Sequence, residues 1–306
     1  MAASLLNYAK VRQNEGGWYG MTAQEKANVP GRVVSLGDTR YRVEPTWGSD
    51  PEQVRLGAIS KIASAPDGSL MICQRRVPSL VRLDRAGRVS DIYSVPMIDP
   101  HGVTIGADGV IYAVDRDGHQ VLVLGPAGSI SMVIGDSSRP RSGAPFNHPT
   151  DVAVTPQGDF FVADGYGNSH VHRFDGAGRL VRTWGGPGNE PGKFSTPHGI
   201  CILAADLVAV GDRENDRIQV FDFDGGLVAV WADVFRPMEL RLGPQGDVFV
   251  SDQVPRITRL DLKGRFVGRC RTPLPYLAHG MAVAATGEIY LSGPGASVVA
   301  RLQPIK

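Results

Sequence analysis

The sequence predicts an all-β fold, a six-bladed β-propeller preceded by a short N-terminal extension. Two observations predict it: six similar segments follow one another along the chain, and the 38 glycines and 22 prolines are spread over its whole length. The segments recur roughly every 40 to 50 residues, the length of one propeller blade. With 306 residues, 42% of them hydrophobic, the chain is long enough to bury a large core in one domain.

Each of the six segments contains a short alternating strand, a turn usually of the form x-x-G, and a second strand. The segments are ISKIASAPDGSLMIC, HGVTIGADGVIYAVD, TDVAVTPQGDFFVAD, HGICILAADLVAVGD, MELRLGPQGDVFVSD and HGMAVAATGEIYLSG, starting near residues 59, 101, 150, 198, 238 and 279. A third strand such as HVHRFD and a fourth such as LVRTWG complete a four-stranded antiparallel meander. Because such a sheet exposes apolar residues on both faces, we expect six of them to stack radially into a closed ring.

The last segment is followed by a single further strand, SVVARLQP, so its blade lacks an outermost strand. We expect residues 41–47 (YRVEPTW) to fill that position and to close the ring. Residues 31–306 are therefore assigned to the propeller. Residues 1–30 are assigned to an N-terminal extension, with a short helix around 23–27, that serves as a cap or as an oligomer contact. The sequence leaves the oligomeric state open.

Composition argues against several classes of partner. The chain has 32 Lys and Arg against 31 Asp and Glu and contains no basic run, so neither nucleic acid nor a membrane surface is expected as a partner. No apolar run approaches the roughly 20 residues of a membrane span, and the N-terminus lacks the apolar core of a signal peptide. The three cysteines, Cys73, Cys201 and Cys270, form no CxxC pair. These features predict a protein of the reducing cytoplasm.

Three of the seven histidines occupy the same place in alternate segments. The positions that open the innermost strands are Ser60, His101, Thr150, His198, Met238 and His279. Alternate blades of a six-bladed ring are about 120° apart, so three such side chains converge on the axis. Three imidazoles with an open fourth position are typical of a catalytic zinc site, or of a site for another divalent transition metal. The alternative is that His-Gly is merely a turn that opens a strand, with each ring satisfied by backbone hydrogen bonds.

Loops that follow the second strands are expected to face the same site, because the second strand of an antiparallel pair ends beside the start of the first. They carry Arg75, Arg76, Arg116, Tyr166 and Arg213. Arginines suit a carboxylate, so the predicted substrate is a small anionic molecule. Tyr166 could act as a general base or could merely fill the wall of the site. Arg213 could bind substrate or could join a surface network of ion pairs with its acidic neighbours.

The stretch FNHPTDVAVTPQGDFFVADGYGNSHVHRF, followed by PGKFSTPHGICI and GDRENDRIQVF, resembles the peptidyl-α-hydroxyglycine α-amidating lyase family of NHL-repeat propellers. The resemblance covers roughly residues 55 to 300 and is closest in the third and fourth blades. It implies three zinc-binding histidines, His101, His198 and His279. It also implies that Tyr166 is the base, that Arg75 and Arg213 position the substrate, and that the reaction cleaves a carbinolamide beside a carboxylate into an amide and glyoxylate.

Two glycines depart from the pattern of that family. Gly167 stands where relatives that process secreted peptides have a cysteine, and Gly280 stands where they have an aspartate that binds a structural calcium ion. A secreted peptide substrate and a structural Ca²⁺ are therefore not expected. The choice of Arg75 over Arg76 as the site-facing arginine depends on alignment alone.

The leading hypothesis is a zinc-dependent lyase acting on a small carbinolamide or α-hydroxy acid and releasing a carbonyl compound. A second hypothesis keeps the same three histidines but makes the protein a hydrolase or hydratase of a small ester, lactone or amide. A third is a binding scaffold without enzymatic activity, because propellers support many unrelated functions.

Overall fold

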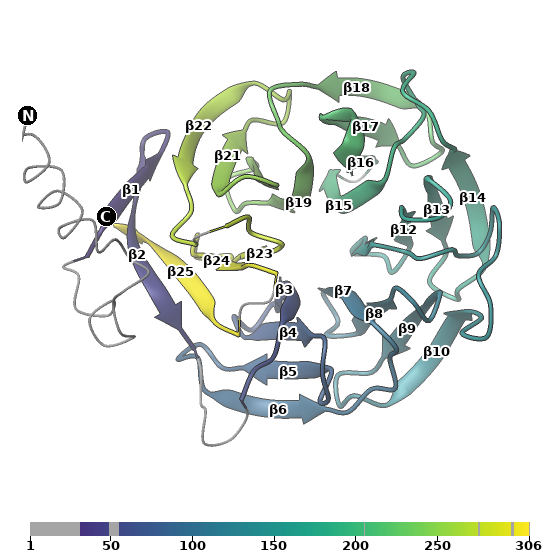
Figure 1. The fold of residues 1–306 in the computed structure, drawn as a ribbon, viewed down its shortest axis with the longest axis horizontal. Helices are drawn as coiled ribbons and strands as arrows, with labels where there is room; N and C mark the ends of the chain where they lie inside the picture. The colour runs from purple at the N-terminus through teal and green to yellow at the C-terminus, as the bar shows by residue number, and fades with distance from the viewer. Residues whose placement is uncertain (1–30, 49–54, 205, 275, 295–296, 306) are drawn as a thin grey trace, which may run out of the picture.

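The computed structural model describes residues 31–48, 55–204, 206–274, 276–294 and 297–305. Six sheets stand around a central axis like the blades of a propeller, which confirms the predicted fold class (Figure 1). The only helical element in these ranges is a single 3-10 turn, Arg213–Asn215. Among the same residues no helix is long and apolar enough to cross a membrane. The predicted extension 1–30, with its short helix, lies outside the described residues.

Every blade is antiparallel, and the first five follow chain order from the axis outward, whereas the outer strands of the last blade come from the N-terminal part of the propeller. The innermost strands are β3 (Ile59–Ser64), β7 (Pro100–Ile105), β11 (Asp151–Val154), β15 (Pro197–Ala204), β19 (Pro237–Leu242) and β23 (Gly280–Val283). The second strands are β4 (Leu70–Gln74), β8 (Ile111–Asp115), β12 (Phe160–Asp164), β16 (Leu207–Asp212), β20 (Val248–Asp252) and β24 (Ile289–Ser292). The third strands are β5 (Leu80–Leu83), β9 (Gln120–Leu124), β13 (His170–Phe174), β17 (Arg217–Asp222), β21 (Arg256–Leu260) and β25 (Val299–Ile305). The fourth strands of the first five blades are β6 (Val89–Tyr93), β10 (Ile130–Gly135), β14 (Leu180–Gly185), β18 (Leu227–Trp231) and β22 (Phe266–Arg271).

The N-terminal part of the propeller completes its last blade, as predicted. Strand β2 (Thr39–Trp47) pairs antiparallel with β25, and Val43 lies opposite Leu302 (Figure 1). An ion pair of 2.8 Å between Arg301 and Glu44 fastens the same two strands. The structure adds a strand that the sequence did not predict, β1 (Val33–Leu36), which extends this blade to five strands.

The hydrophobic core lies between the blades. One cluster joins Tyr112 and Val114 of the second blade to Val152, Phe160 and Phe174 of the third, and other clusters repeat the arrangement around the ring. The innermost and second strands are therefore buried on both faces, as the continuous apolar runs of FFVA and LVAV suggest. This packing holds the innermost strands at fixed angles around the axis.

A polar side chain at the end of the second strand fixes the loop that leads into the innermost strand of the same blade. Asp115, Asp164, Asp212 and Asp252 are fully buried, and each accepts a backbone N–H from the residue 17 positions earlier in the chain. In the first blade the side-chain oxygen of Gln74 accepts the N–H of Gly57 in the same way. Each bond fixes the backbone two to four residues before the strand that lines the axis.

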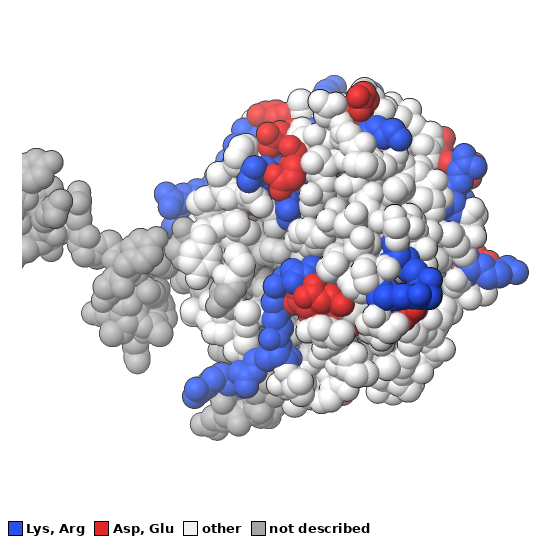
Figure 2. Space-filling model, turned by 45° about the vertical axis from the view of Figure 1, so that its right-hand side comes forward, with Lys and Arg blue, Asp and Glu red and all other residues white. Residues whose placement is uncertain are grey.

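Charged side chains are mixed on the surface. On the face shown in Figure 2, blue basic and red acidic groups stand next to each other in small patches separated by uncharged surface. The ion pairs of the protein include some within a single turn, such as Arg88 with Asp84 and Arg179 with Asp175. Exposed pairs of this kind contribute little to stability.

Candidate metal centre

The three predicted histidines meet at the axis. His101 and His198 are the second residues of β7 and β15, and His279 immediately precedes β23. Their ring centroids form a nearly equilateral triangle with sides of 5.1, 5.2 and 5.2 Å. All three rings are buried, and one nitrogen from each lies within 4.8 Å of the others, so the trio could hold one metal ion.

Local irregularities in strand pairing aim the side chains at the axis. In β7, Pro100 pairs with Asp115 and Gly102 pairs with Val114, so His101 is the extra residue of a bulge. In β15 the register shifts between Pro197 and Ile200, across His198. Bulges are a common means of redirecting a side chain beside a functional site. The same register shift occurs at Ser60 of β3 and at Met238 of β19, so it marks the start of the innermost strand in blades with and without a metal-site histidine.

Each imidazole is oriented by a carbonyl oxygen of the next blade. The Nδ1 atoms of His101, His198 and His279 lie 2.7, 2.8 and 2.7 Å from the carbonyl oxygens of Thr150, Met238 and Ser60. A carbonyl can only accept, so each Nδ1 carries the proton and each Nε2 keeps a free lone pair. Backbone hydrogen bonds therefore satisfy one nitrogen of each ring, and the other remains available as a metal ligand.

Burial keeps the trio neutral. The pKa of His101 and that of His198 are lowered well below the usual value, first by burial and then by the charge of another histidine of the trio. Burial lowers the pKa of His279 to about 4. Neutral imidazole is the form that binds metal ions, so the site is ready for a cation throughout the neutral pH range.

Tyr166 brings a hydroxyl to the same point. Its oxygen lies 3.2 Å from Nε2 of His101 and 3.1 Å from Nε2 of His198. Arg213 donates a hydrogen bond of 3.3 Å to this oxygen, and its guanidinium lies 5.2 Å from the centre of the tyrosine ring. A phenol in this position can exchange a proton with a ligand of the metal, and the guanidinium would stabilise the phenolate.

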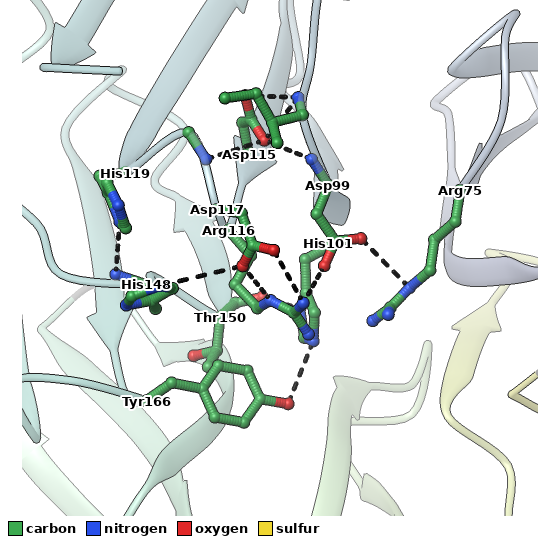
Figure 3. A network of polar contacts seen from close by, with 12 residues as sticks. Arg75, Asp99, His101, Asp115, Arg116, Asp117, His119, His148, Thr150 and Tyr166 are labelled. Carbon is green, nitrogen blue, oxygen red and sulfur yellow. Dashed lines mark hydrogen bonds and ion pairs between the residues drawn. The ribbon is translucent and has the colours of Figure 1, made fainter. Parts of the chain in front are cut away.

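Two further arginines, Arg75 and Arg116, converge on Asp99 beside His101 (Figure 3). The Asp99 carboxylate contacts Arg116 and lies 3.4 Å from Nε of Arg75. Arg116 also forms a 2.8 Å ion pair with Asp117, and its guanidinium lies 5.6 Å from the centre of the Tyr166 ring. Burial raises the pKa of Asp99, and the charges of the two arginines oppose that rise. Arg75 and Arg116 are thus held within reach of a single carboxylate.

The structure separates the two adjacent arginines of the first blade. Nε of Arg75 lies 3.4 Å from the carboxylate of Asp99, in the network that contains His101 (Figure 3). The stem of Arg76 instead lies over Gly57, so close that a Cβ on that glycine would stand 2.3 Å from the arginine Cδ. Arg75 is therefore the arginine of this pair that faces the site.

Arg213 belongs to a network of ion pairs with its acidic neighbours, one of the two roles that the sequence left open, and substrate binding by this residue stays a prediction. It forms a 2.8 Å ion pair with Glu214 as well as its bond to Tyr166. Glu214 also pairs with Arg236 at 3.1 Å. The ion pair on one edge of the guanidinium holds it in place while another nitrogen reaches the tyrosine.

The remaining histidines stand apart from the trio. His119 and His148 stack edge-to-face with centroids 4.3 Å apart, and Nε2 of His148 lies 3.9 Å from Asp117 (Figure 3). His172 is fully buried against Asp164 at 3.2 Å, where it supports the second strand of its blade. His170, its neighbour on the same strand, lies 6.1 Å from it, centroid to centroid.

Two residues near the site were missed by sequence reasoning. Asp99 lies in the irregular segment before β7, where no periodicity marks it, and Asp117 lies in the loop after β8.

Gly280 offers no ligand for a calcium ion. A Cβ there would lie 2.7 Å from the hydroxyl oxygen of Ser292 and 3.1 Å from the Cα of Lys61, so a side chain at this position would require both neighbours to shift.

Comparison with known proteins gives consistent results. The model of the NHL repeat matches residues 146–174 and 194–221. Peptidyl-α-hydroxyglycine α-amidating lyase 1 of Drosophila melanogaster is 28% identical over 245 residues, which are 67% of this chain and 44% of the fly protein. Peptidylglycine α-amidating monooxygenase of Rattus norvegicus is 41% identical over 136 residues, which are 41% of this chain and 14% of the rat protein. The chain therefore matches less than half of the length of either relative.

Among solved structures, a streptogramin B lyase superposes with a TM-score of 0.65 at 14% identity, covering 89% of this chain and all of that one. At this level of identity the likeness concerns the fold alone. The fold and the repeats together define an NHL-repeat β-propeller. Within that class the chain is similar to proteins named peptidyl-α-hydroxyglycine α-amidating lyases, at 28 to 39% identity.

Proposed function

We propose that this protein is a metal-dependent lyase that cleaves the C–N bond of a small carbinolamide or related α-hydroxy acid and releases a carbonyl compound such as glyoxylate. One observation carries the proposal. The Tyr166 hydroxyl oxygen lies 3.1 and 3.2 Å from the free nitrogens of two buried, convergent histidines and accepts a hydrogen bond from Arg213. Three potential metal ligands, a phenol and a guanidinium thus meet at one point, and similar proteins are named as lyases.

The donor set fits zinc. Three neutral imidazole nitrogens, each oriented by a hydrogen bond on its other nitrogen, leave one position free for a substrate oxygen. Cobalt, manganese and iron also bind this type of donor. Zn²⁺ is our first choice among them, because three imidazoles with an open fourth position are typical of catalytic zinc sites. When bound, such a cation supplies Lewis-acid polarisation of the substrate hydroxyl.

The residues around the trio have separate tasks in this scheme. Arg75 and Arg116, which already share the carboxylate of Asp99, bind and orient the carboxylate of the substrate. Tyr166, as phenolate stabilised by Arg213, accepts the proton of the substrate hydroxyl. As the carbonyl forms, the electrons of the C–N bond leave with nitrogen, and Tyr166 returns the proton to the departing amide nitrogen. The reaction consumes no water and needs no redox cofactor.

Metal content is the first test. The purified protein should contain close to one equivalent of a transition metal and should lose activity when a chelator removes it. Addition of zinc should restore the activity. A protein without stoichiometric zinc, manganese, iron or cobalt, and unresponsive to all four, would contradict the proposal and favour a binding scaffold.

Product analysis in ¹⁸O-labelled water separates the lyase from a hydrolase that uses the same histidines. With an N-acyl-α-hydroxyglycine as substrate, a lyase yields glyoxylate and an unlabelled primary amide. A hydrolase of the amide bond instead yields a carboxylic acid that contains ¹⁸O. The second outcome would replace the lyase with the hydrolase and leave the metal centre unchanged.

A further inference from the structure

A buried cluster of charged residues lies on the three blades that carry no metal-site histidine. Lys61, Asp151 and Glu239 come from β3, β11 and β19 and are at most 2% exposed. The Lys61 ammonium lies 2.7 Å from Asp151 and also contacts Glu239. Arg241, further along β19, contacts Glu239 and brings the cluster to two positive and two negative groups. The proposed reaction uses none of these side chains.

Three members of this cluster, Lys61, Asp151 and Glu239, each directly follow a residue that orients a histidine of the trio. Ser60, whose carbonyl accepts from His279, precedes Lys61. The carbonyls of Thr150 and Met238 accept in the same way from His101 and His198. Thr150 precedes Asp151, and Met238 precedes Glu239. Three carbonyls that hold the metal ligands are thus one peptide unit away from three side chains joined by ion pairs.

The blades that carry the histidines have glycine at the equivalent position. A Cβ on Gly102 would lie 3.0 Å from the carbonyl oxygen of Thr150, and one on Gly199 would lie 2.9 Å from that of Met238. A Cβ on Gly280 would lie 3.1 Å from Cα of Lys61. The two sets of strands therefore touch backbone to backbone, so a shift of a carbonyl-bearing strand moves the neighbouring histidine as well.

We propose that Lys61, Asp151 and Glu239 are positioning residues for the metal centre: their ion pairs fix the carbonyls of Ser60, Thr150 and Met238, and these carbonyls set the tautomer and direction of the three imidazoles. The proposal extends the proposed function, because it assumes that the trio binds a metal. A buried charge that loses its partner is strongly unfavourable, so the cluster holds its three strands at one spacing. Residues that orient metal ligands commonly change metal affinity when they are replaced.

Glu239→Gln is the most informative variant, because it keeps the size of the side chain and leaves Lys61 paired with Asp151. We expect its affinity for Zn²⁺, measured by competition with a chelator, to fall about tenfold to a hundredfold. We also expect the visible absorption of the Co²⁺-substituted protein to change in position and intensity. Lys61→Met should have a larger effect in the same direction.

Asp247→Asn is the matched control. Asp247 forms an ion pair with Arg259 in the same blade as Glu239, but it lies beside no carbonyl that orients a histidine. This variant should lower the melting temperature and leave the metal affinity and the Co²⁺ spectrum unchanged. If Glu239→Gln behaves like this control, the cluster is purely structural and the proposal is wrong.

A readout without metal keeps this inference separate from the proposed function. In the metal-free wild-type protein, ¹⁵N chemical shifts of the imidazoles should show the Nδ1–H tautomer for all three histidines. In Glu239→Gln the tautomer of His198 should become mixed, since the carbonyl of Met238 is less firmly held. Failure of the wild-type protein to bind metal would contradict the proposed function, whereas an unchanged tautomer in this variant would contradict the positioning role.

Discussion

The Nδ1 atom of His279 lies 2.7 Å from the carbonyl oxygen of Ser60, and this contact joins the last blade of the propeller to the first. The equivalent contacts of His101 with Thr150 and of His198 with Met238 join the second blade to the third and the fourth to the fifth. The candidate metal centre is therefore part of the ring that supports it. Its geometry follows from how adjacent blades are packed.

Replacement of one histidine of the trio should remove the metal. His198→Ala leaves two imidazoles, and we expect less than a tenth of the wild-type metal content after dialysis, because two ligands bind a divalent ion far more weakly than three. Elemental analysis of the dialysed protein measures this. His170→Ala, a change on the third strand of the third blade, is the control and should retain the metal.

Tyr166→Phe should separate catalysis from metal binding. The phenol lies beside the trio but is not one of its three ligands. We expect kcat to fall about 10²- to 10⁴-fold, the usual effect of losing a group that transfers a proton, at unchanged metal content. Steady-state kinetics with an α-hydroxy acid substrate measure the change. Tyr112→Phe, within the core of the second blade, should keep wild-type kinetics. A Tyr166→Phe enzyme with full activity would exclude this residue as the base.

The neighbouring residues Arg75 and Arg76 offer a matched pair of variants. Arg75→Ala should raise KM for a carboxylate substrate about tenfold to a hundredfold, the effect expected for loss of a charged hydrogen bond. Arg76→Ala should leave KM unchanged, because its side chain packs over Gly57. A substrate analogue with an amide in place of the carboxylate should lose the difference between the two variants. Equal KM values for both variants would show that Arg75 makes no contact with substrate.

The stability of the metal-free protein should depend on the protonation of His279. Its pKa is about 4 in the folded protein and 6.5 when exposed, so between these values the unfolded chain binds more protons. The free energy of unfolding should therefore fall as pH decreases from about 6.5 to 4, by roughly 3 kcal/mol from this residue alone. Burial raises the pKa of Glu239, which acts in the opposite direction.

Comparison with a variant isolates the contribution of the histidine from the other titrating groups. In His279→Asn the decrease in stability between pH 6.5 and 4 should be smaller than in the wild-type protein, because the ionisable ring is gone. Urea unfolding of chelator-treated protein at several pH values provides the measurement. Parallel curves for the two proteins would contradict the assigned role of His279.

The sequence predicts the architecture well because each blade is defined by residues that are close together in the sequence. The turn glycines and alternating strands define each blade without reference to distant residues. The same alignment places His101, His198 and His279 in one register, and closure by residues 41–47 follows from the missing strand of the last blade. The added strand β1 has no counterpart in the other blades, so no repeat could indicate it.

The details of the site depend on loops and on contacts between blades, which the repeat does not encode. The distance of Tyr166 from two imidazoles depends on the course of one loop, and Asp99 lies in an irregular segment. Lys61, Asp151 and Glu239 occupy the same position in three of the aligned segments. The other three segments have glycine at that position. That pattern indicates a specialised position, but their mutual contacts could only be established in three dimensions.

The pairing of β2 with β25 sets the order of events when the protein is made. Strand β2 is synthesised early, whereas β25 is synthesised last. The two strands can therefore pair only after synthesis of the last blade. Five blades can form during that interval, but the ring stays open and His279 has not yet reached its place opposite Ser60. Metal binding should therefore follow synthesis of the last blade. A nascent chain arrested before that blade would lack His279 and should be unable to retain a metal ion at this site.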